Sequence, residues 1–375
     1  MKIVYGVCGE GFGHSSHAIL VAKYLEKKGH TVLIATYGRA YNLLKKNFKV
    51  IETNWPELVY KEGRMSKKES IKIMGKKIIK NKFIKILRKI IKFKPDLFIS
   101  DLEIYSSFIS YLLKKPLITI SNQNRFAHCK ISKPAKKEKG YLFMKTISYF
   151  HAPKSNYKII LSLKKYKTKR KNSYFAPPII RKEIQKLKPK QGKKILVYLS
   201  RPKKQILNTL KKTNQKFVVF GYNKNIKQKN LEFKTKDKFL KEFEKCKAII
   251  STSGFTSIGE ALYLNKPYLA LPLKGQFEQA FNAILIEKKK FGMYIKELKK
   301  QDLEEFIKNI PEYRKNIKKY NIDTEKIYKI LNKILRKIEI EKKERKQNKL
   351  IKNQSQIIPM PWAHSTIELW TKYID

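Results

Sequence analysis

The chain has 375 residues, of which 42% are hydrophobic and 12% aromatic; this length suits about two domains and this apolar content excludes a disordered protein. Lysine and arginine number 86 against 30 acidic residues, a formal net charge of +56. The positive charge is spread evenly over both halves of the chain, which favours a general lysine bias over a dedicated nucleic-acid-binding arm, so nucleic acid is not an expected partner.

The cysteines and the hydropathy pattern indicate the compartment. Cys8, Cys129 and Cys246 lie far apart without CxxC spacing, so neither a disulfide framework nor a zinc site is expected. No signal peptide precedes the first apolar run, and no apolar run approaches the about 20 residues that span a bilayer. We expect a cytoplasmic protein, with a peripheral position on the inner face of the cell membrane left open.

Apolar runs rich in β-branched residues alternate with helical stretches, which is typical of parallel α/β sheets. In the first half, strands are expected over residues 2–8, 30–37, 95–101 and 116–122, with helices over 15–29 and 102–115. A second series of strands is expected over residues 193–200, 216–222, 247–253 and 266–273.

The predicted domains follow from this order. Residues 1–178 form an N-terminal domain, the proline- and lysine-rich residues 179–192 form a linker, and residues 193–350 form a C-terminal domain. A charged helix is expected over 324–352. The apolar and aromatic segment 351–375 is expected to pack back toward the N-terminal domain, because exposed tryptophans are costly.

A glycine loop follows the first expected strand. Gly9, Gly11 and Gly13 alternate with other residues, so the backbone can turn sharply and approach a ligand ahead of a helix N-terminus that favours negative charge. The loop is neither GxxxxGK[ST] nor GxGxxG, and the second strand ends without the acidic residue of the dinucleotide fingerprint. Nicotinamide and flavin binding are disfavoured, and no cofactor is expected.

His14 comes directly after this loop, at the sheet edge where open α/β folds bind ligands. A helix N-cap or a partly buried histidine is one interpretation, and a general base is the favoured one. Asp101 ends the strand 95–101 and would emerge at the same edge. It would either orient His14 or cap the helix 102–115, and both roles stay open.

Two further segments of the N-terminal domain bear on the acceptor. Residues 67–94 carry many lysines with apolar residues at three- and four-residue steps, which predicts one or two amphipathic helices. Their lysine face is either simply solvated or docks onto an anionic membrane surface. Residues 122–139 would determine acceptor specificity. Arg125 and His128 would either contact the acceptor or lie in a solvated loop, which is the favoured interpretation.

The segment 251–262 reads STSGFTSIGEAL. Small hydroxyl residues and a glycine at a helix start expose backbone N–H groups to an anion such as a diphosphate. Glu260, one turn further, can accept two ribose hydroxyls, and Glu278 and Gln279 can accept hydroxyls of a sugar. An ordinary capped helix is the alternative interpretation.

Taken together, this segment resembles the donor-binding segment of GT-B nucleotide-sugar glycosyltransferases, G-x-x-[ST]-x-x-E-A followed by prolines and [DE]-Q-x-x-N-A. The matching positions are Gly254, Ser257, Glu260, Ala261, Pro267, Pro272, Glu278, Gln279, Asn282 and Ala283. The chain resembles UDP-glycosyltransferases and the N-acetylglucosaminyltransferase of the peptidoglycan lipid intermediate, and most of all archaeal and bacterial relatives with a G-x-G-x-G-H loop. The resemblance implies an α/β GT-B fold, two Rossmann-like parallel-sheet domains facing a cleft.

The resemblance also implies a reaction. His14 would be the base, Asp101 its orienting partner, and a sugar would move with inversion from a nucleotide-sugar, in first place a UDP-sugar, to a hydroxyl acceptor such as a lipid or cell-surface glycan precursor. The implied donor-binding residues are Ser200, Arg201, Ser253, Gly254, Phe255, Thr256, Ser257, Glu260, Glu278 and Gln279. Phe239 and Leu240 would line the pocket for the nucleobase of the donor. No metal is expected, because no DxD motif occurs.

Departures from the family pattern keep alternatives open. Thr252 stands where plant enzymes have a histidine, and LSRPKK replaces the glycine-rich phosphate loop of the peptidoglycan enzyme, so sugar and nucleotide stay undetermined. A UDP-N-acetylglucosamine 2-epimerase of the same fold is one alternative, disfavoured because its acidic S-G-G-x-Q-E-E segment is missing. A non-catalytic protein that binds RNA or an acidic membrane is another.

Overall fold

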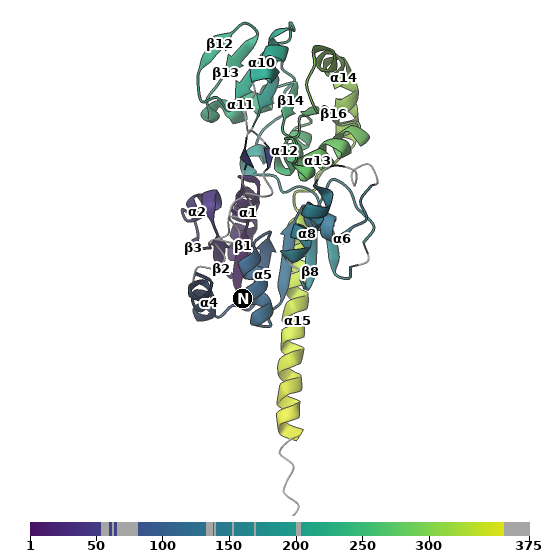
Figure 1. The fold of residues 1–375 in the computed structure, drawn as a ribbon. Helices are drawn as coiled ribbons and strands as arrows, with labels where there is room; N and C mark the ends of the chain where they lie inside the picture. The colour runs from purple at the N-terminus through teal and green to yellow at the C-terminus, as the bar shows by residue number, and fades with distance from the viewer. Residues whose placement is uncertain are drawn as a thin grey trace, which may run out of the picture. The chain divides into compact units, whose positions relative to one another are not determined.

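The computed structural model describes residues 1–53, 60–61, 64–65, 82–132, 138, 140–151, 154–168, 170–199 and 204–355. The chain divides into two compact units, Met1–Tyr328 and Lys329–Asp375. The first unit contains two seven-stranded sheets, which are coloured purple to blue and teal to green in Figure 1. This arrangement confirms the predicted α/β class.

The first sheet is parallel throughout and has the strand order β3-β2-β1-β6-β7-β8-β9. Its strands are β1 (Lys2–Val7), β2 (Thr31–Thr36), β3 (Lys49–Glu52), β6 (Leu97–Asp101), β7 (Leu117–Ser121), β8 (Tyr157–Leu161) and β9 (Ser173–Ala176). The four strands predicted in this half correspond to β1, β2, β6 and β7. Strands β2 and β3 lie on one side of β1, and β6 to β9 lie on the other side, so the direction in which strands are added changes between β1 and β6. Open α/β sheets bind ligands at such a switch point.

The helices in this part of the chain have the following bounds. They are α1 (Gly13–Lys27), α2 (Gly38–Leu44), α4 (Lys82–Phe93), α5 (Ile104–Leu112), α6 (Asn124–His128), α8 (Tyr141–Phe150) and α9 (Lys182–Gln185), and a small hairpin pairs β4 (Tyr60–Lys61) with β5 (Arg64–Met65). On α4, Ile86 and Ile90 pack in one core cluster with Ile109 of α5 and Val4 of β1. The i to i+4 spacing of the two α4 residues places both on the buried side.

The second sheet has the order β12-β13-β11-β10-β14-β15-β16 and is parallel except for the β12–β13 pair. Its strands are β10 (Ile195–Tyr198), β11 (Phe217–Phe220), β12 (Ile226–Gln228), β13 (Leu231–Phe233), β14 (Ala248–Ser251), β15 (Tyr268–Ala270) and β16 (Gly292–Tyr294). Its helices are α10 (Lys204–Lys211), the 3-10 turn η1 (Lys236–Lys238), α11 (Phe239–Lys245), α12 (Phe255–Tyr263), α13 (Phe277–Lys288) and α14 (Lys300–Lys318). All four strands predicted in this half are present.

The charged helix predicted over 324–352 is present as α15 (Lys326–Ser355). Residues 356–375 lie outside the described residues, so the packing predicted for the C-terminal segment stays a prediction. In the part of the chain that is described, no helix is both long and apolar enough to cross a membrane.

The β1–β6 register positions the candidate site. Val7 is the partner of Asp101, and the N–H of Cys8 donates to the carbonyl of Asp101 at 2.9 Å. The glycine loop therefore leaves β1 beside the last residue of β6. In the second sheet, Ser251 ends β14 beside Tyr198 of β10, so the loop into α12 leaves from an equivalent edge.

Candidate functional site

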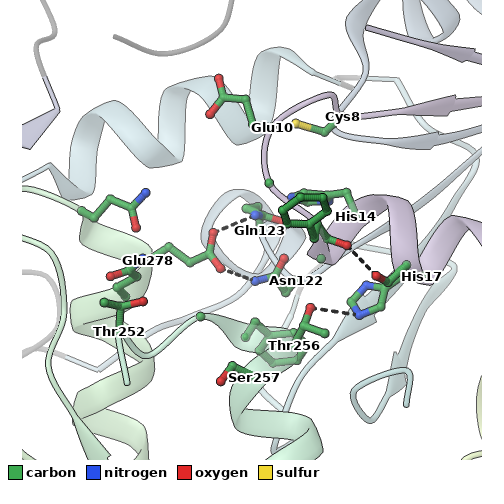
Figure 2. A pocket seen from close by; sticks show the side chains of 18 of the residues that line it. Cys8, Glu10, His14, His17, Asn122, Gln123, Thr252, Thr256, Ser257 and Glu278 are labelled. Carbon is green, nitrogen blue, oxygen red and sulfur yellow. Dashed lines mark hydrogen bonds between the residues drawn. The ribbon is translucent and has the colours of Figure 1, made fainter. Parts of the chain in front are cut away.

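A cavity of about 1020 Å³ lies where loops of the two sheets meet. The glycine loop, the start of α1 and helix α8 line it from the first sheet, and the first turn of α12 and the loop before α13 line it from the second (Figure 2). Its volume is at the upper end of the range of about 300–1,000 Å³ that is typical of ligand pockets.

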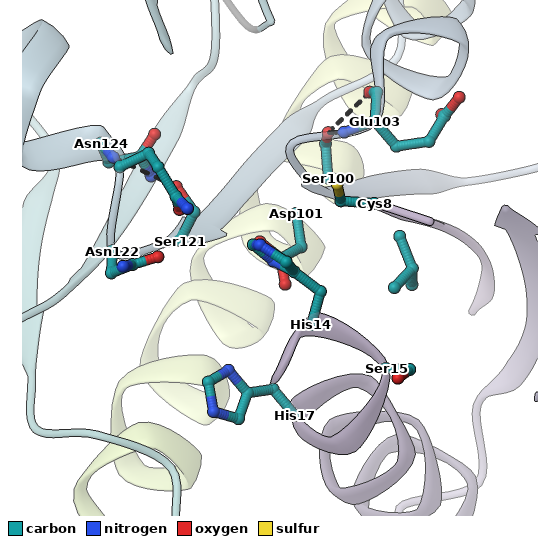
Figure 3. A network of polar contacts seen from close by, with 12 residues as sticks. Cys8, His14, Ser15, His17, Ser100, Asp101, Glu103, Ser121, Asn122 and Asn124 are labelled. Carbon is teal, nitrogen blue, oxygen red and sulfur yellow. Dashed lines mark hydrogen bonds and ion pairs between the residues drawn. The ribbon is translucent and has the colours of Figure 1, made fainter. Parts of the chain in front are cut away.

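His14 and Asp101 form the polar centre of this cavity. His14 Nδ1 is 2.8 Å from Asp101 Oδ1, and the two side chains are 18% and 2% exposed (Figure 3). Burial by itself lowers the pKa of His14, but the negative charges of Asp101, Glu278 and Glu10 oppose it and raise that pKa to about 9. Because Nδ1 faces the carboxylate, Nε2 is the ring atom left for a substrate.

The structure settles what caps α5. Glu103 is the N-cap, and its carboxylate accepts from the backbone N–H groups of Tyr105 at 3.1 Å and Ser106 at 2.7 Å. Asp101 is therefore not the cap, and its side chain is directed to His14 instead. Burial raises the pKa of Glu103 to about 7, although the hydrogen bonds from Ser106 and Tyr105 lower it.

The glycine loop is shaped by close contacts. A Cβ on Gly9 would lie 2.3 Å from the carbonyl oxygen of Tyr37, and one on Gly13 would lie 2.7 Å from Thr256 Oγ1. Gly11 has a φ of +73°, which favours glycine. Helix α1 has no side-chain cap hydrogen bond and no acidic residue in its first turn, so its N-terminus presents positive potential to the cavity.

The N-terminus of α12 reaches the cavity from the opposite sheet. The predicted donor residues Gly254, Phe255, Thr256 and Ser257 line it, whereas Ser253 is fully buried and does not. The N-cap of α12 makes no side-chain hydrogen bond, and its first turn has no acidic residue. Two helix N-termini thus face one cavity, an arrangement that favours an anion.

Glu260 lies on α12 and is paired in a way that the sequence did not indicate. Arg181 Nε and a terminal nitrogen donate to its two oxygens at 2.5 and 2.8 Å, and the Glu260 carboxylate is 5% exposed. Both side chains line the cavity. The ribose contact of Glu260 stays a prediction.

Glu278 and Gln279 begin α13 and also line the cavity. The Glu278 carboxylate accepts from the amides of Asn122 and Gln123, each at 2.7 Å, and these residues follow β7 of the first sheet (Figure 2). Gln279 Oε1 accepts from the N–H of Leu273 at 2.8 Å. Glu278 therefore joins the two sheets at the cavity wall.

The remaining predicted residues have different outcomes. Ser200 and Arg201 lie outside the described residues, and Phe239 and Leu240 line the cavity. The solvated loop expected for Arg125 and His128 is wrong, since they are 0% and 7% exposed on α6. The Arg125 guanidinium donates to Asn282 Oδ1 at 2.7 Å and lies over three phenylalanine rings, which favour a cation.

Among the described residues, no group of three or more His, Cys, Asp or Glu side chains is arranged to hold a metal ion.

Comparisons with known proteins agree with this geometry. A family model described as "Glycosyl transferase family 1" matches residues 1–311. An "Uncharacterized glycosyltransferase" of Methanosarcina acetivorans is 26% identical over 337 residues, which cover 78% of this chain and 85% of that relative.

Two solved structures show the same fold. CalG4, the calicheamicin glycosyltransferase, superposes with a TM-score of 0.60 at 13% identity, covering 86% of this chain and 94% of its own. SsfS6 from Streptomyces sp. SF2575, complexed with thymidine diphosphate, gives 0.57 at 14% identity, with coverages of 85% and 94%. The predicted GT-B arrangement of two Rossmann-like domains is confirmed.

Proposed function

The chain belongs to glycosyl transferase family 1 and is a glycosyltransferase, and we propose that it transfers a sugar, with inversion, from a nucleoside diphosphate sugar to a hydroxyl acceptor. One observation carries the proposal: the ion pair of His14 and Asp101 shares a cavity with the uncapped N-terminus of α12. A base and an anion site are the two parts that such a displacement needs.

His14 acts as the base in this proposal. Nε2 takes the proton of the acceptor hydroxyl as that oxygen attacks the anomeric carbon, and the bond from this carbon to the phosphate oxygen breaks with its electron pair going to the diphosphate. Asp101 holds the ring through Nδ1 and stabilises the imidazolium that forms. Attack from the face opposite the leaving group inverts the anomeric configuration.

The diphosphate is held at α12. Backbone N–H groups of its first turn and the helix dipole stabilise the charge that develops on the leaving group. The structural relative SsfS6, whose complex contains thymidine diphosphate, supports a nucleoside diphosphate donor. A UDP-sugar is the donor that we propose to test first.

We propose a lipid-linked acceptor that is met at an anionic membrane surface. The side chains of Phe143, Met144 and Ile147 on α8 line the cavity and give it an apolar wall. On α4, Ile84 and Ile91 are 52% and 49% exposed. Exposed cations lie between these isoleucines, namely Lys85, Arg88 and Lys89.

Calorimetric titration with UDP, TDP, GDP and their common sugars tests the donor. We expect one nucleotide series to bind the wild-type protein and Glu260→Ala to weaken that binding, while the distant, exposed Glu312→Ala does not. If none of these ligands binds folded wild-type protein at millimolar concentration, the proposed function is wrong.

Co-sedimentation with lipid vesicles tests the membrane proposal. We expect salt-sensitive binding to phosphatidylglycerol vesicles, since each basic residue near the surface contributes about 1 kcal/mol. Ile84→Glu with Ile91→Glu should remove the binding, whereas the exposed Ile226→Glu on β12 should not. Equal binding to phosphatidylcholine, or no binding, contradicts the membrane proposal.

A further inference from the structure

Helix α1 carries a second histidine, one turn beyond His14. His17 is 5% exposed and lines the cavity. Its Nε2 is 3.1 Å from Oγ1 of Thr256, in the first turn of α12 (Figure 2). The helix of the proposed base and the helix of the proposed diphosphate site are therefore joined directly by a hydrogen bond.

The threonine hydroxyl lies against α1. A Cβ on Gly13 would lie 2.7 Å from Thr256 Oγ1, so only a glycine allows the present approach. Gly13 and His17 are four residues apart and thus share one face of α1. Thr256 Oγ1 consequently lies between these two residues, and its position depends on both.

His17 is uncharged at neutral pH. Burial, together with the positive charges of His14 and Arg181, lowers its pKa to about 4, although the negative charge of Asp101 opposes them. A neutral imidazole carries one N–H. With that hydrogen on Nε2, the ring donates to Thr256 Oγ1 and leaves the hydroxyl hydrogen of Thr256 free to donate elsewhere.

We propose that His17 is a positioning residue for the leaving diphosphate: it donates to Thr256 Oγ1 and thereby directs the Thr256 hydroxyl hydrogen to a phosphate oxygen at the N-terminus of α12. This rests on the proposed function. His17 comes from the acceptor-side sheet, whereas Thr256 lies on α12 in the donor-side sheet. The contact therefore also keeps the His14 base in line with the phosphate site.

Calorimetric titration with UDP and TDP tests this inference on matched variants. His17→Phe and Thr256→Val remove the hydrogen bond, whereas His17→Gln and Thr256→Ser each retain a group that can form it. We expect each of the first two to weaken nucleotide binding about tenfold, and each of the second two to restore affinity to within about threefold of wild type.

A double-mutant cycle separates positioning from loss of stability. Because both single variants break the same interaction, His17→Phe with Thr256→Val should bind nucleotide no more weakly than either single variant. His128→Phe is the control, since His128 is also buried with its pKa lowered to about 4 but does not line the cavity. We expect it to leave nucleotide affinity unchanged.

The outcomes are distinct. If folded His17→Phe binds nucleotide as tightly as wild type, or if the losses of the two single variants multiply in the double variant, the inference is overturned and the proposed function is untouched. If wild-type protein binds neither UDP nor TDP, the donor site for these nucleotides is refuted, and the inference fails with it.

Discussion

His14 Nδ1 and Asp101 Oδ1 are 2.8 Å apart because β1 and β6 are neighbouring parallel strands that end together. The ring follows the glycine loop after β1, and the carboxylate is the last residue of β6. Since the pKa of His14 is about 9, the imidazole is largely protonated at neutral pH in the free protein. A proton-accepting role therefore predicts a specific pH dependence.

Asp101→Asn should change that dependence. In the wild type, kcat/KM should rise with pH and level off near pH 9, where His14 becomes neutral. The amide removes the negative charge that counteracts the effect of burial on the pKa of His14. That pKa should therefore fall, and kcat/KM should stop rising at a lower pH. The plateau should drop by roughly 100-fold or more, because the ring is no longer oriented.

The measurement for this variant is kcat/KM from pH 6 to 10, with nucleotide affinity as the check on folding. A profile that keeps its wild-type midpoint would show that Asp101 does not set the charge of His14.

Glu103→Gln should alter the dependence of stability on pH. Burial raises the folded-state pKa of Glu103 from 4.5 to about 7, so the folded protein holds this proton more tightly than the unfolded chain. The resulting stabilisation is complete below pH 4.5 and is lost as pH rises through about 7. The variant cannot show this loss.

Urea unfolding between pH 4 and 8 gives the free energy of unfolding of the variant and of the wild type. The difference between the two is the informative quantity, because the contributions of His14 and His17 are present in both proteins and cancel. We expect this difference to shift in favour of Glu103→Gln as pH rises from 4.5 to 7. A difference that does not change with pH for Glu103→Gln would refute the prediction.

Gly13→Ala should strain the junction of α1 with α12. The added methyl group would lie 2.7 Å from Thr256 Oγ1, so we expect a loss of about 1–3 kcal/mol in the free energy of unfolding. In a Thr256→Ala background the contact is gone, and alanine favours the helix by about 0.5–1 kcal/mol over glycine.

Thermal and urea unfolding of the four combinations measure this coupling. The glycine substitution should be costly alone and neutral or stabilising beside Thr256→Ala. An equal cost in both backgrounds would show that the close approach does not govern the junction.

Glu260→Gln should reduce discrimination for the ribose of the donor. If its carboxylate accepts the ribose hydroxyls, wild-type protein binds UDP about tenfold more tightly than its 2′,3′-dideoxy analogue, and the variant loses that preference. Arg181→Gln is the control, because it breaks the same ion pair but keeps the carboxylate. Discrimination that persists in Glu260→Gln would assign Glu260 to the ion pair alone.

The sequence predicted the elements that consist of continuous apolar runs. Strand β1 has no charged residue from Ile3 to Val7, and β6 is apolar from Leu97 to Ile99 before it ends in Ser100 and Asp101. Both strands, and the proximity of His14 to Asp101, therefore followed from pattern and topology. Strands β3, β8, β9, β12, β13 and β16 were not predicted. Strand β12 is exposed along its length, so it lacks the apolar run that marks a buried strand. Such segments are strands only because a neighbour pairs with them.

The contacts between the two sheets were beyond sequence reasoning. The bonds of Glu278 to Asn122 and Gln123, and of His17 to Thr256, join residues whose proximity depends on how two separate sheets meet. Hydrophobic periodicity indicates which side of an element is buried, but it carries no information about how the two sheets are placed relative to each other. The N-cap residue of α5 could not be identified from the sequence for a different reason. Asp101 and Glu103 both precede the helix, and either carboxylate could accept from its first N–H groups.

Donor turnover by wild-type protein and His14→Gln tests the central claim most directly. Release of nucleoside diphosphate from a bound sugar nucleotide is measured at pH 9, with water or solubilised lipid as acceptor, and the dissociation constant of the same donor is measured in parallel. The account predicts that turnover falls by about 100-fold or more in the variant, while the dissociation constant stays within about threefold. Equal turnover by the two proteins would contradict a base at His14.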